Sequence, residues 1–465
     1  MTTVQSRATS LDYTAFDGYI ADAMPAWTEE LLAFCAIPSE AGDTEALRAA
    51  ADWVAARLRR LGATVDVVER DGAPPLVVGE LGAGRTLLAV QHYDVQPAVP
   101  LELWTSPPYQ PEVRDGRLYA RGASDNKGEL LARIWAVEAY LATIGDLPCR
   151  LRFLVQGEEE GGGANFGPLL DLRPGLREAD GALSEGGEID GHGRPVVYGG
   201  VRGMVSFELV CRTIAYDAHS SLANLLPNAA SRLVMALSTF WDAEGVPQIT
   251  GLEEGVRPPT ATDRALIEGS PLDEIDDLFG EYGTDRLVAG RRGVEALEVL
   301  TFGTTCNVQG LWSGYSGPGD KTITPAEAHA RIDIRLIPSQ QPDAVVAAVR
   351  RHLAGRGFGD IEIIVSDESY PAWWTQADDP IIAAAIRASE AVLGTTAVQR
   401  LSAPGTEPLY DVCAPGNLPA TSLGSSDEEA RMHAPDESWS LAGAALAARM
   451  TGRFFDEFAA IEEMP

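Results

Sequence analysis

The segment RTLLAVQHYDVQP, residues 85–97, constrains the fold more than any other stretch of the chain. It begins with a short apolar run, residues 86–90, of the kind that forms a strand buried on both faces. In open α/β sheets binding sites form at the carboxyl ends of strands, so His92, which follows the run, is placed to bind a metal ion. Asp94 points to the same side of an extended chain, where its carboxylate can orient the imidazole. A surface loop with an ordinary histidine and aspartate is the alternative interpretation.

Charge and cysteine content argue against several classes of function. The 465 residues carry a formal net charge of −32, which opposes binding to nucleic acid and to anionic membranes. No apolar run reaches the roughly 18 residues of a membrane helix, and the N-terminus lacks the features of a secretory signal. The five cysteines are scattered and form no C-x-x-C pair, so neither a disulfide framework nor a thiolate metal site is expected. We expect a cytoplasmic protein.

Hydrophobic periodicity predicts alternating helices and strands. Residues 43–61 give the clearest helix, with Asp43 as its N-terminal cap and Gly62 at its end. Further helices are expected at residues 14–35, 128–143, 341–355 and 378–393 and from about 437, and strands at residues 63–69, 75–80, 86–91, 151–156, 203–211, 329–336, 409–412 and 420–423. This alternation predicts an α/β fold with a mainly parallel central sheet flanked by helices.

The character of the sequence changes near residue 200 and changes back after Pro371. Between these points, strands with one polar face and a variable acidic stretch at about 241–298 predict an α+β domain inserted into the α/β domain. We therefore expect a catalytic domain formed by residues 1–200 and 373–465, and an inserted domain formed by residues 201–372.

Acidic and imidazole side chains gather at the predicted strand ends: His92, Asp94, Asp125, Glu159, Glu160, Glu185 and His433. So many carboxylates at one edge of a sheet repel one another unless cations neutralise them. Histidine and carboxylate ligands without thiolates suit Zn²⁺, Mn²⁺ or Co²⁺, and two bridged ions would lie about 3.5–4 Å apart. In the tandem pair Glu159 and Glu160, one carboxylate can bind metal while the other stays free as a general base.

Five motifs resemble those of the co-catalytic zinc peptidase family that includes carnosine and cytosolic dipeptidases, aminoacylases, glutamate carboxypeptidase and succinyl-diaminopimelate desuccinylase. They are HYDVQPA (92–98), LYARGASDNKG (118–128), GEEEGGG (157–163), LSEGG (183–187) and MHAPDES (432–438). The resemblance spans nearly the whole chain in the family's order, and the dipeptidase branch looks closest.

The resemblance implies a site with two divalent metal ions. Zinc is the first candidate, and manganese and cobalt are the alternatives. The implied ligands are Asp125 as the bridge, His92 and Glu185 on one ion, and Glu160 and His433 on the other. Glu159 would act as general base toward a water that bridges the ions, and Asp94 would complete the catalytic set.

In the family the inserted domain is a lid and often the dimer interface, which implies a homodimer. The segment YDAHSS, residues 216–221, is similar to a loop whose histidine, here His219, reaches the substrate carbonyl, in dimeric members from the partner subunit. Arg335 matches the arginine that holds the substrate carboxylate, and Asn307 matches a further substrate contact. The segment APGTEP, residues 403–408, stands where the family has Gly-Gly-Ser-Ile-Pro and departs from that pattern. Its implied substrate contacts are Gly405, Thr406 and Glu407.

Other polar residues have simpler interpretations. His192 and His352 carry no motif and are interpreted as surface residues, and His329, at the start of a strand, as structural. Lys127, one of only two lysines in the chain, can orient loop carbonyls instead of touching substrate. Cys306 has no basic neighbour to lower its pKa and is interpreted as a packing residue.

Together these features predict a metal-dependent hydrolase that cleaves dipeptides, with an N-acyl-amino-acid deacylase or a carboxypeptidase-type hydrolase as alternatives. In the resembling family, glutamate at the position of Glu185 is typical of acylases and carboxypeptidases, whereas the overall pattern here is typical of dipeptidases. The substrate, a small peptide or an N-acyl amino acid, therefore stays open. A catalytically silent metal-dependent binding protein and a dinuclear phosphoesterase are the rivals from other classes.

Overall fold

The computed structural model describes residues 12–462, which fall into two compact units. The first unit is formed by the chain up to Gly200, by Trp374–Ala403 and by the chain from Pro408 onward. The second is formed by Val201–Trp373 and Pro404–Glu407, so the short segment 404–407 joins the second unit and not the first. Over residues 12–462, no helix combines the length and the apolarity that crossing a bilayer requires.

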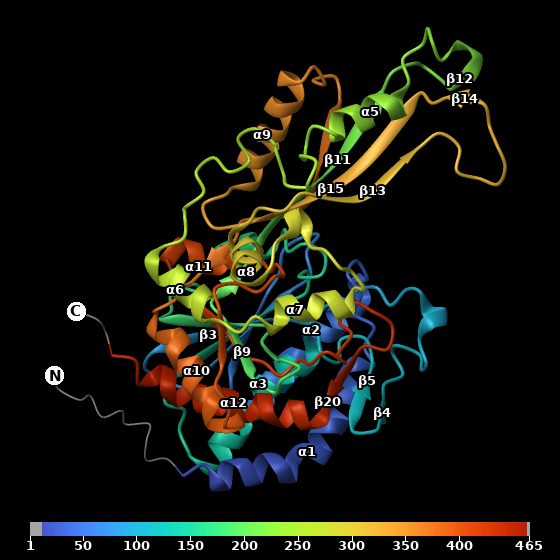
Figure 1. Ribbon diagram of the computed structural model, residues 1–465. Helices are drawn as coiled ribbons and strands as arrows, with labels where there is room; N and C mark the ends of the chain where they lie inside the picture. The colour runs from blue at the N-terminus through green and yellow to red at the C-terminus, as the bar shows by residue number, and fades with distance from the viewer. Residues whose placement is uncertain (1–11, 463–465) are drawn as a thin grey trace. The chain divides into compact units, whose positions relative to one another are not determined.

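A six-stranded sheet forms the centre of the first unit (Figure 1). Its strands, in spatial order, are β1 (Thr64–Val68), β2 (Leu76–Leu81), β6 (Arg150–Gln156), β3 (Thr86–His92), β7 (Gly181–Ser184) and β19 (Ala420–Ser422). Strands β6, β3, β7 and β19 run parallel, whereas β1 and β2 add to one edge in antiparallel pairing. The mainly parallel α/β sheet is thus confirmed, with an antiparallel edge that periodicity did not reveal.

Helices pack around this sheet: α1 (Thr14–Cys35), α2 (Thr44–Leu61), α3 (Lys127–Thr143), α4 (Phe166–Asp171), α10 (Pro380–Leu393), α11 (Leu409–Cys413) and α12 (Leu441–Ala459). Helices α1, α3 and α12 pack against one another, and α10 packs against α12 (Figure 1). Helix α2 begins and ends as predicted, because the Asp43 side chain accepts the Ala46 N–H and Gly62 adopts a φ of +96°.

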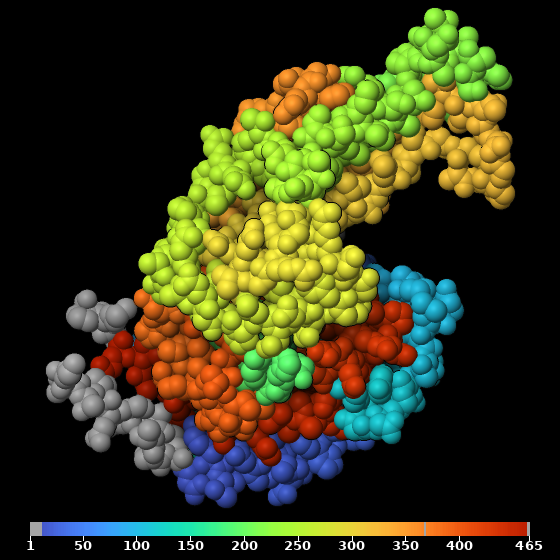
Figure 2. Space-filling view, in the orientation of Figure 1, coloured from blue at the N-terminus to red at the C-terminus, as the bar shows by residue number. Residues whose placement is uncertain are grey.

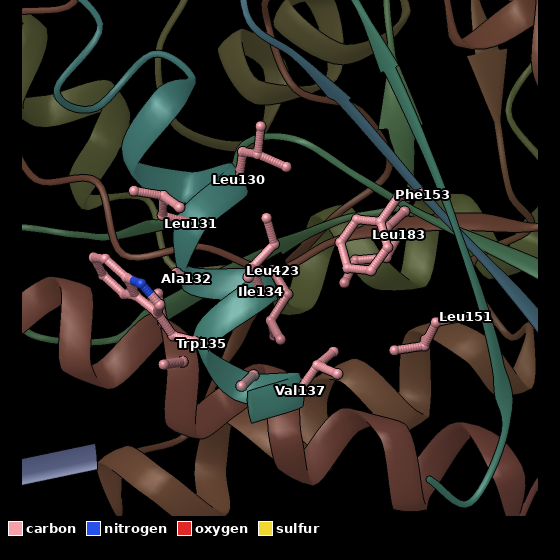
Figure 3. Packing of buried hydrophobic residues seen from close by; sticks show 14 of the residues in the cluster. Leu130, Leu131, Ala132, Ile134, Trp135, Val137, Leu151, Phe153, Leu183 and Leu423 are labelled. Atoms are coloured by element: carbon pink, nitrogen blue, oxygen red, sulfur yellow. The ribbon is translucent and has the colours of Figure 1, made fainter. Parts of the chain in front are cut away.

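Part of the core of the first unit lies between α3 and the sheet. The side chains of Ile134 and Val137 point from α3 toward Leu151 and Phe153 of β6 (Figure 3), and all four are buried. Strand β3 is buried along its whole length, as the apolar run predicted. His92 therefore stands at the carboxyl end of a strand that is fixed on both faces.

Two small sheets complete the first unit: β4 (Glu112–Arg114), β5 (Arg117–Tyr119) and β20 (Ser438–Ser440), and β8 (Glu188–Ile189), β9 (Pro195–Tyr198) and β18 (Val398–Arg400). The prediction of a strand at residues 409–412 is wrong. Helix α11 begins after Pro408, and its buried residues Leu409, Val412 and Cys413 are three and four positions apart, as one side of a helix requires. A short apolar run does not distinguish these two structures.

The second unit is built on an antiparallel sheet, with the strand order β13 (Asn307–Ser313), β15 (Glu327–Leu336), β11 (Gly203–Arg212) and β16 (Glu362–Tyr370). Helices α5 (Ala229–Leu237) and α9 (Pro342–Gly355) pack on one face of this sheet (Figure 1) and share its core. The unit also holds a two-stranded pair, β12 (Ala218–His219) and β14 (Ile323–Thr324), and the helices α6 (Ala261–Gly269), α7 (Asp273–Glu281) and α8 (Gly293–Phe302). The expected α+β architecture of the inserted region is confirmed.

His352 is not a surface residue, contrary to its interpretation from the sequence. It lies on the buried side of α9 together with Val345 and Val349 and is 2% exposed. Thr239 Oγ1 lies 2.9 Å from its Nε2, and the Thr250 N–H donates to its Nδ1 at 3.0 Å. Helical spacing from the valines placed this histidine in the core, where both ring nitrogens are satisfied.

One apolar loop of the first unit is exposed. It contains the short 3-10 turn η2 (Leu101–Leu103) and lies in the segment coloured cyan at the surface (Figure 2). Val99, Leu101 and Leu103 are each more than half exposed. The base of the loop is fixed, since the Trp104 indole N–H donates to the Ala98 carbonyl at 2.8 Å.

Candidate active site

The central sheet gathers the predicted ligands at one edge. His92 ends β3, Glu159 and Glu160 follow β6, and Glu185 follows β7. These strands are parallel neighbours, so their carboxyl ends meet. Asp125, in the loop before α3, and His433, in the segment before β20, reach the same edge, as their contacts show.

The imidazoles and carboxylates form a continuous chain of contacts. His92 Nε2 lies 3.1 Å from Asp125 Oδ1 and 3.1 Å from Glu185 Oε2. The second oxygen of Asp125, Oδ2, lies 2.9 Å from His433 Nε2. That nitrogen is 3.3 Å from Glu160 Oε2. Asp125 thus directs one oxygen toward each histidine, an arrangement that suits a carboxylate between two cations.

The donor atoms lie close enough together to hold cations. The ligand atoms of His92, Asp125 and Glu160 lie within 4.8 Å of one another, and so do those of His92, Glu159 and Glu185. Glu160 Oε1 is buried and has no hydrogen-bond partner among residues 12–462. A buried carboxylate oxygen without a partner is costly unless a cation lies beside it. The residues present therefore fit divalent metal ions with nitrogen and oxygen ligands.

The electrostatics of the cluster show an excess of negative charge. Burial raises the pKa of Glu185, and burial together with the charge of Glu185 raises the pKa of Glu159 well above its usual range. Contacts with the carboxylates of Asp125 and Glu160 raise the pKa of His433 to about 10. Burial lowers the pKa of His92, but its carboxylate neighbours outweigh this and raise it. The site therefore favours bound protons or cations at neutral pH.

Asp94 ties two of the strand ends together and is fully buried. Its main-chain oxygen lies 3.0 Å from His92 Nδ1, which leaves Nε2 for the cluster. Its carboxylate accepts the Glu159 N–H at 3.2 Å and the Glu160 N–H at 2.9 Å. Lys127, by contrast, points away from the cluster, since its ammonium donates to the Ile37 carbonyl at 2.6 Å and the Phe34 carbonyl at 3.3 Å.

Two buried carboxylates beside the predicted ligands had no role assigned to them from the sequence. Glu129 accepts the Gly186 N–H at 2.8 Å, directly after Glu185, and Glu437 accepts three main-chain N–H groups of the loop that carries Asp125. Each of these two glutamates could have been recognised from its place in the sequence. Glu437 stands in the MHAPDES motif, and Glu129 is an acid in the buried first half of α3.

The predicted substrate residues lie in the second unit, in separate places. Arg335 Nη1 donates to Thr406 Oγ1 at 3.0 Å, and the Gly405 carbonyl accepts the Arg202 N–H at 3.0 Å. These contacts hold segment 404–407, including the buried Glu407, beside the start of β11 and the end of β15.

The remaining predicted residues of the second unit have local partners. The Asn307 amide donates to Asp333 Oδ2 at 2.7 Å, and the exposed His219 has its Nδ1 2.9 Å from Ser221 Oγ. His329 contacts Glu208 at 2.7 Å, in keeping with its interpretation as structural. Burial raises the pKa of Cys306 to about 12, which suits packing and not nucleophilic chemistry.

Comparison with known proteins identifies the family. Residues 88–457 match the model of Peptidase family M20/M25/M40. The chain belongs to this family. The resemblance inferred from the motifs is thereby confirmed, and the protein is a metallopeptidase whose family implies divalent metal ions.

Three relatives illustrate the similarity. A Beta-Ala-His dipeptidase of Rattus norvegicus is 30% identical over 318 residues, which are 64% of this chain and 63% of that protein. A Cys-Gly metallodipeptidase of Schizosaccharomyces pombe is 27% identical over 349 residues, 71% of this chain and 73% of that protein. The crystal structure of an M20 family metallo-carboxypeptidase from Sulfolobus solfataricus superposes with a TM-score of 0.87 at 31% identity, covering 94% of this chain and 99% of that one.

Proposed function

We propose that this metallopeptidase hydrolyses dipeptides that carry a free C-terminal carboxylate. Its cofactors would be two divalent metal ions, with zinc as the first candidate. The observation that carries the proposal is Asp125, which has one oxygen toward His92 and the other toward His433. Glu185 and Glu160 flank this bridge on its two sides. The two relatives named as dipeptidases support the substrate class.

The residues of the cluster divide the chemistry between them. Bound divalent ions supply Lewis acidity toward a water molecule and the substrate carbonyl. Glu159 takes the proton of the attacking water on its carboxylate and passes it to the leaving amine. Its neighbour Glu160 is a ligand and is not available for that transfer. Asp94 fixes the His92 tautomer and the main chain of both glutamates.

The second unit would bind the carboxylate end of the substrate. Arg335 is the anchor, because a guanidinium pairs with a carboxylate through charge-assisted hydrogen bonds, and Thr406 already orients it. Asn307, Gly405, Thr406 and Glu407 would contribute further contacts. Through this unit the protein would form a homodimer in which His219 stabilises the tetrahedral oxyanion of the partner's site.

A second candidate, a carboxypeptidase-type or N-acyl-amino-acid hydrolase, is favoured by Glu185 and by the similarity to the Sulfolobus carboxypeptidase. Both candidates need the carboxylate anchor but differ at the amino end of the substrate. A free amino group calls for a partner near the metal ions, and an acylated one does not. The blocked and unblocked forms of one dipeptide therefore separate them.

The test compares kcat/KM for a dipeptide, its N-acetylated form and its C-terminal amide. Amidation should cost far more than acetylation, and Arg335→Gln should remove the difference between acid and amide. Arg331→Gln, on the same strand, is the matched control and should leave it intact. If acetylation abolishes activity while amidation is harmless, the enzyme is an aminopeptidase and the anchor assignment is wrong.

A further inference from the structure

The C-terminal segment that carries His433 is bonded to the loop that carries Asp125. Strand β20 pairs with β5, so that Ser438 lies opposite Tyr119 and Trp439 opposite Leu118. The Ala120 N–H continues this ladder by donating to the Glu437 carbonyl at 3.1 Å. Beyond Ala120 the main chain of the loop turns away from a regular strand pairing.

The side chain of Glu437 takes over where the ladder stops. Its Oε1 accepts the N–H groups of Ser124 and Asp125, each at 3.0 Å. Its Oε2 accepts the Gly122 N–H at 3.0 Å and the Arg121 Nη1 at 2.7 Å. One carboxylate therefore binds three of the four main-chain N–H groups of residues 122–125, and the fourth, of Ala123, donates to the Ala120 carbonyl.

This carboxylate is fully buried, and among the described residues it belongs to neither of the two groups of closely spaced candidate ligand atoms. Its paired cation, Arg121, is 1% exposed and belongs to the same loop. Glu437 is thus not itself a predicted metal ligand. Its side chain fixes the main chain of Asp125, and it lies four residues after His433. The ligands His92 and Glu185 have other supports, Asp94 and Glu129.

We propose that Glu437 is a positioning residue of the metal centre, which locks the Asp125 loop to the His433 segment and thereby sets the affinity for the ion held by Asp125, Glu160 and His433. The inference rests on the proposed two-ion site. Loss of the Glu437 carboxylate frees the main chain of Asp125 and removes the side-chain tie between this loop and the His433 segment, which then keeps only its main-chain pairing. On the other ion it affects Asp125 alone, so the two affinities should change unequally.

The test is a titration of the metal-free protein with Co²⁺, in which binding is measured by calorimetry and by visible absorption. In Glu437→Gln an amide NH₂ faces main-chain donors where an oxygen stood, while size and shape are kept. One of the two binding events should weaken ~10–100-fold, as is usual when an outer partner of a ligand is lost, and the other should change much less. His433→Ala should weaken the same event, and Glu185→Ala the other one.

Two further variants serve as controls for this titration. Asp456→Asn is the matched control, because Asp456 is a half-buried carboxylate that accepts hydrogen bonds from Tyr13 and Tyr140. Among the described residues it has no hydrogen bond to a loop that carries a predicted ligand, so its Co²⁺ binding should equal the wild type. Glu437→Asp retains the charge and should weaken the same event to a smaller extent.

The outcomes separate this inference from the proposed function. If the wild-type protein binds a single ion, the two-ion site is wrong. If the wild type binds two and Glu437→Gln binds both as tightly, or loses both equally, the positioning role is overturned. The positioning role is also overturned if neither variant of Glu437 folds, since the residue is then a general structural requirement.

Discussion

Three consecutive glutamates after strand β6 have identical side chains and different surroundings. Glu158 accepts the N–H and the side-chain amide of Asn165, each at 3.1 Å. Glu160 contacts His433, and Glu159 is buried near the charge of Glu185. The main-chain N–H groups of Glu159 and Glu160 both donate to Asp94, whereas the Glu158 side chain is held by Asn165. Chemical role here follows from position and not from residue type.

The substitution Glu159→Gln should therefore leave metal binding intact and reduce kcat by ~10²–10⁴-fold, because the amide cannot accept the proton of the attacking water. Glu158→Gln is the adjacent control and should retain near wild-type turnover. Metal content and steady-state rates measured on the same preparations check both statements. Wild-type turnover in Glu159→Gln would assign the base to another residue.

At the level of elements, Lys127 connects two helices. It is the first residue of α3, and its ammonium binds the carbonyls of Phe34, in the last turn of α1, and of Ile37. A cation at this position satisfies carbonyls that a helix end leaves open. The same residue begins the helix that follows the Asp125 loop, so the site depends on how α1 and α3 are joined.

Lys127 predicts a pH dependence of stability. Burial lowers its pKa from 10.5 to about 8 in the folded protein. Between these values the unfolded chain binds more protons than the folded one, so this residue makes the free energy of unfolding rise as pH increases from about 8 to 10.5. Lys127→Met has no titrating group at this position. The free energy of unfolding of the wild type minus that of the variant should therefore increase from about pH 8 to pH 10.5.

Denaturant unfolding of both proteins at several pH values checks this sign. Lys321→Met, at the exposed second lysine, is the matched control and should follow the wild type across the range. A difference between wild type and Lys127→Met that falls with pH, or stays constant, would show that Lys127 is not titrated in the folded state as its burial requires.

At the level of the whole molecule, the ligand cluster and the predicted substrate residues belong to different units. The first unit holds all five predicted ligands, and the second holds His219, Asn307, Arg335 and segment 404–407. His219 is exposed on its own unit, with its Nδ1 bound to Ser221. The other ring nitrogen of His219, Nε2, has no hydrogen bond to Ser221. It is therefore the nitrogen that would face a substrate carbonyl.

If His219 acts across a dimer, mixing two inactive variants should restore activity. One heterodimer site then combines an intact cluster from His219→Ala with an intact His219 from Glu159→Gln. Subunit exchange is verified separately, with differently tagged chains. No recovery of dipeptide hydrolysis in mixtures that exchange fully would place His219 in its own subunit's site or outside catalysis.

Local patterns predicted the parts of the fold that local physics determines. The buried run of β3 and the Asp43 and Gly62 ends of α2 depend on a few neighbouring residues, and they appear as expected. The edge pairing of β1 and β2 and the helix at 409–413 depend on packing that no short window contains. The bond between Glu437 and Asp125 joins residues 312 positions apart, so the motif alone did not reveal this contact.

In the proposed function, two divalent ions held at Asp125 enable the hydrolysis of dipeptides. The most direct measurement is metal content per chain together with dipeptide hydrolysis, before chelation, after exhaustive chelation and after stepwise return of Zn²⁺. We predict two ions per chain, loss of hydrolysis in the metal-free protein and full recovery only after the second equivalent. Undiminished hydrolysis by metal-free protein would show that the reaction does not depend on bound metal ions.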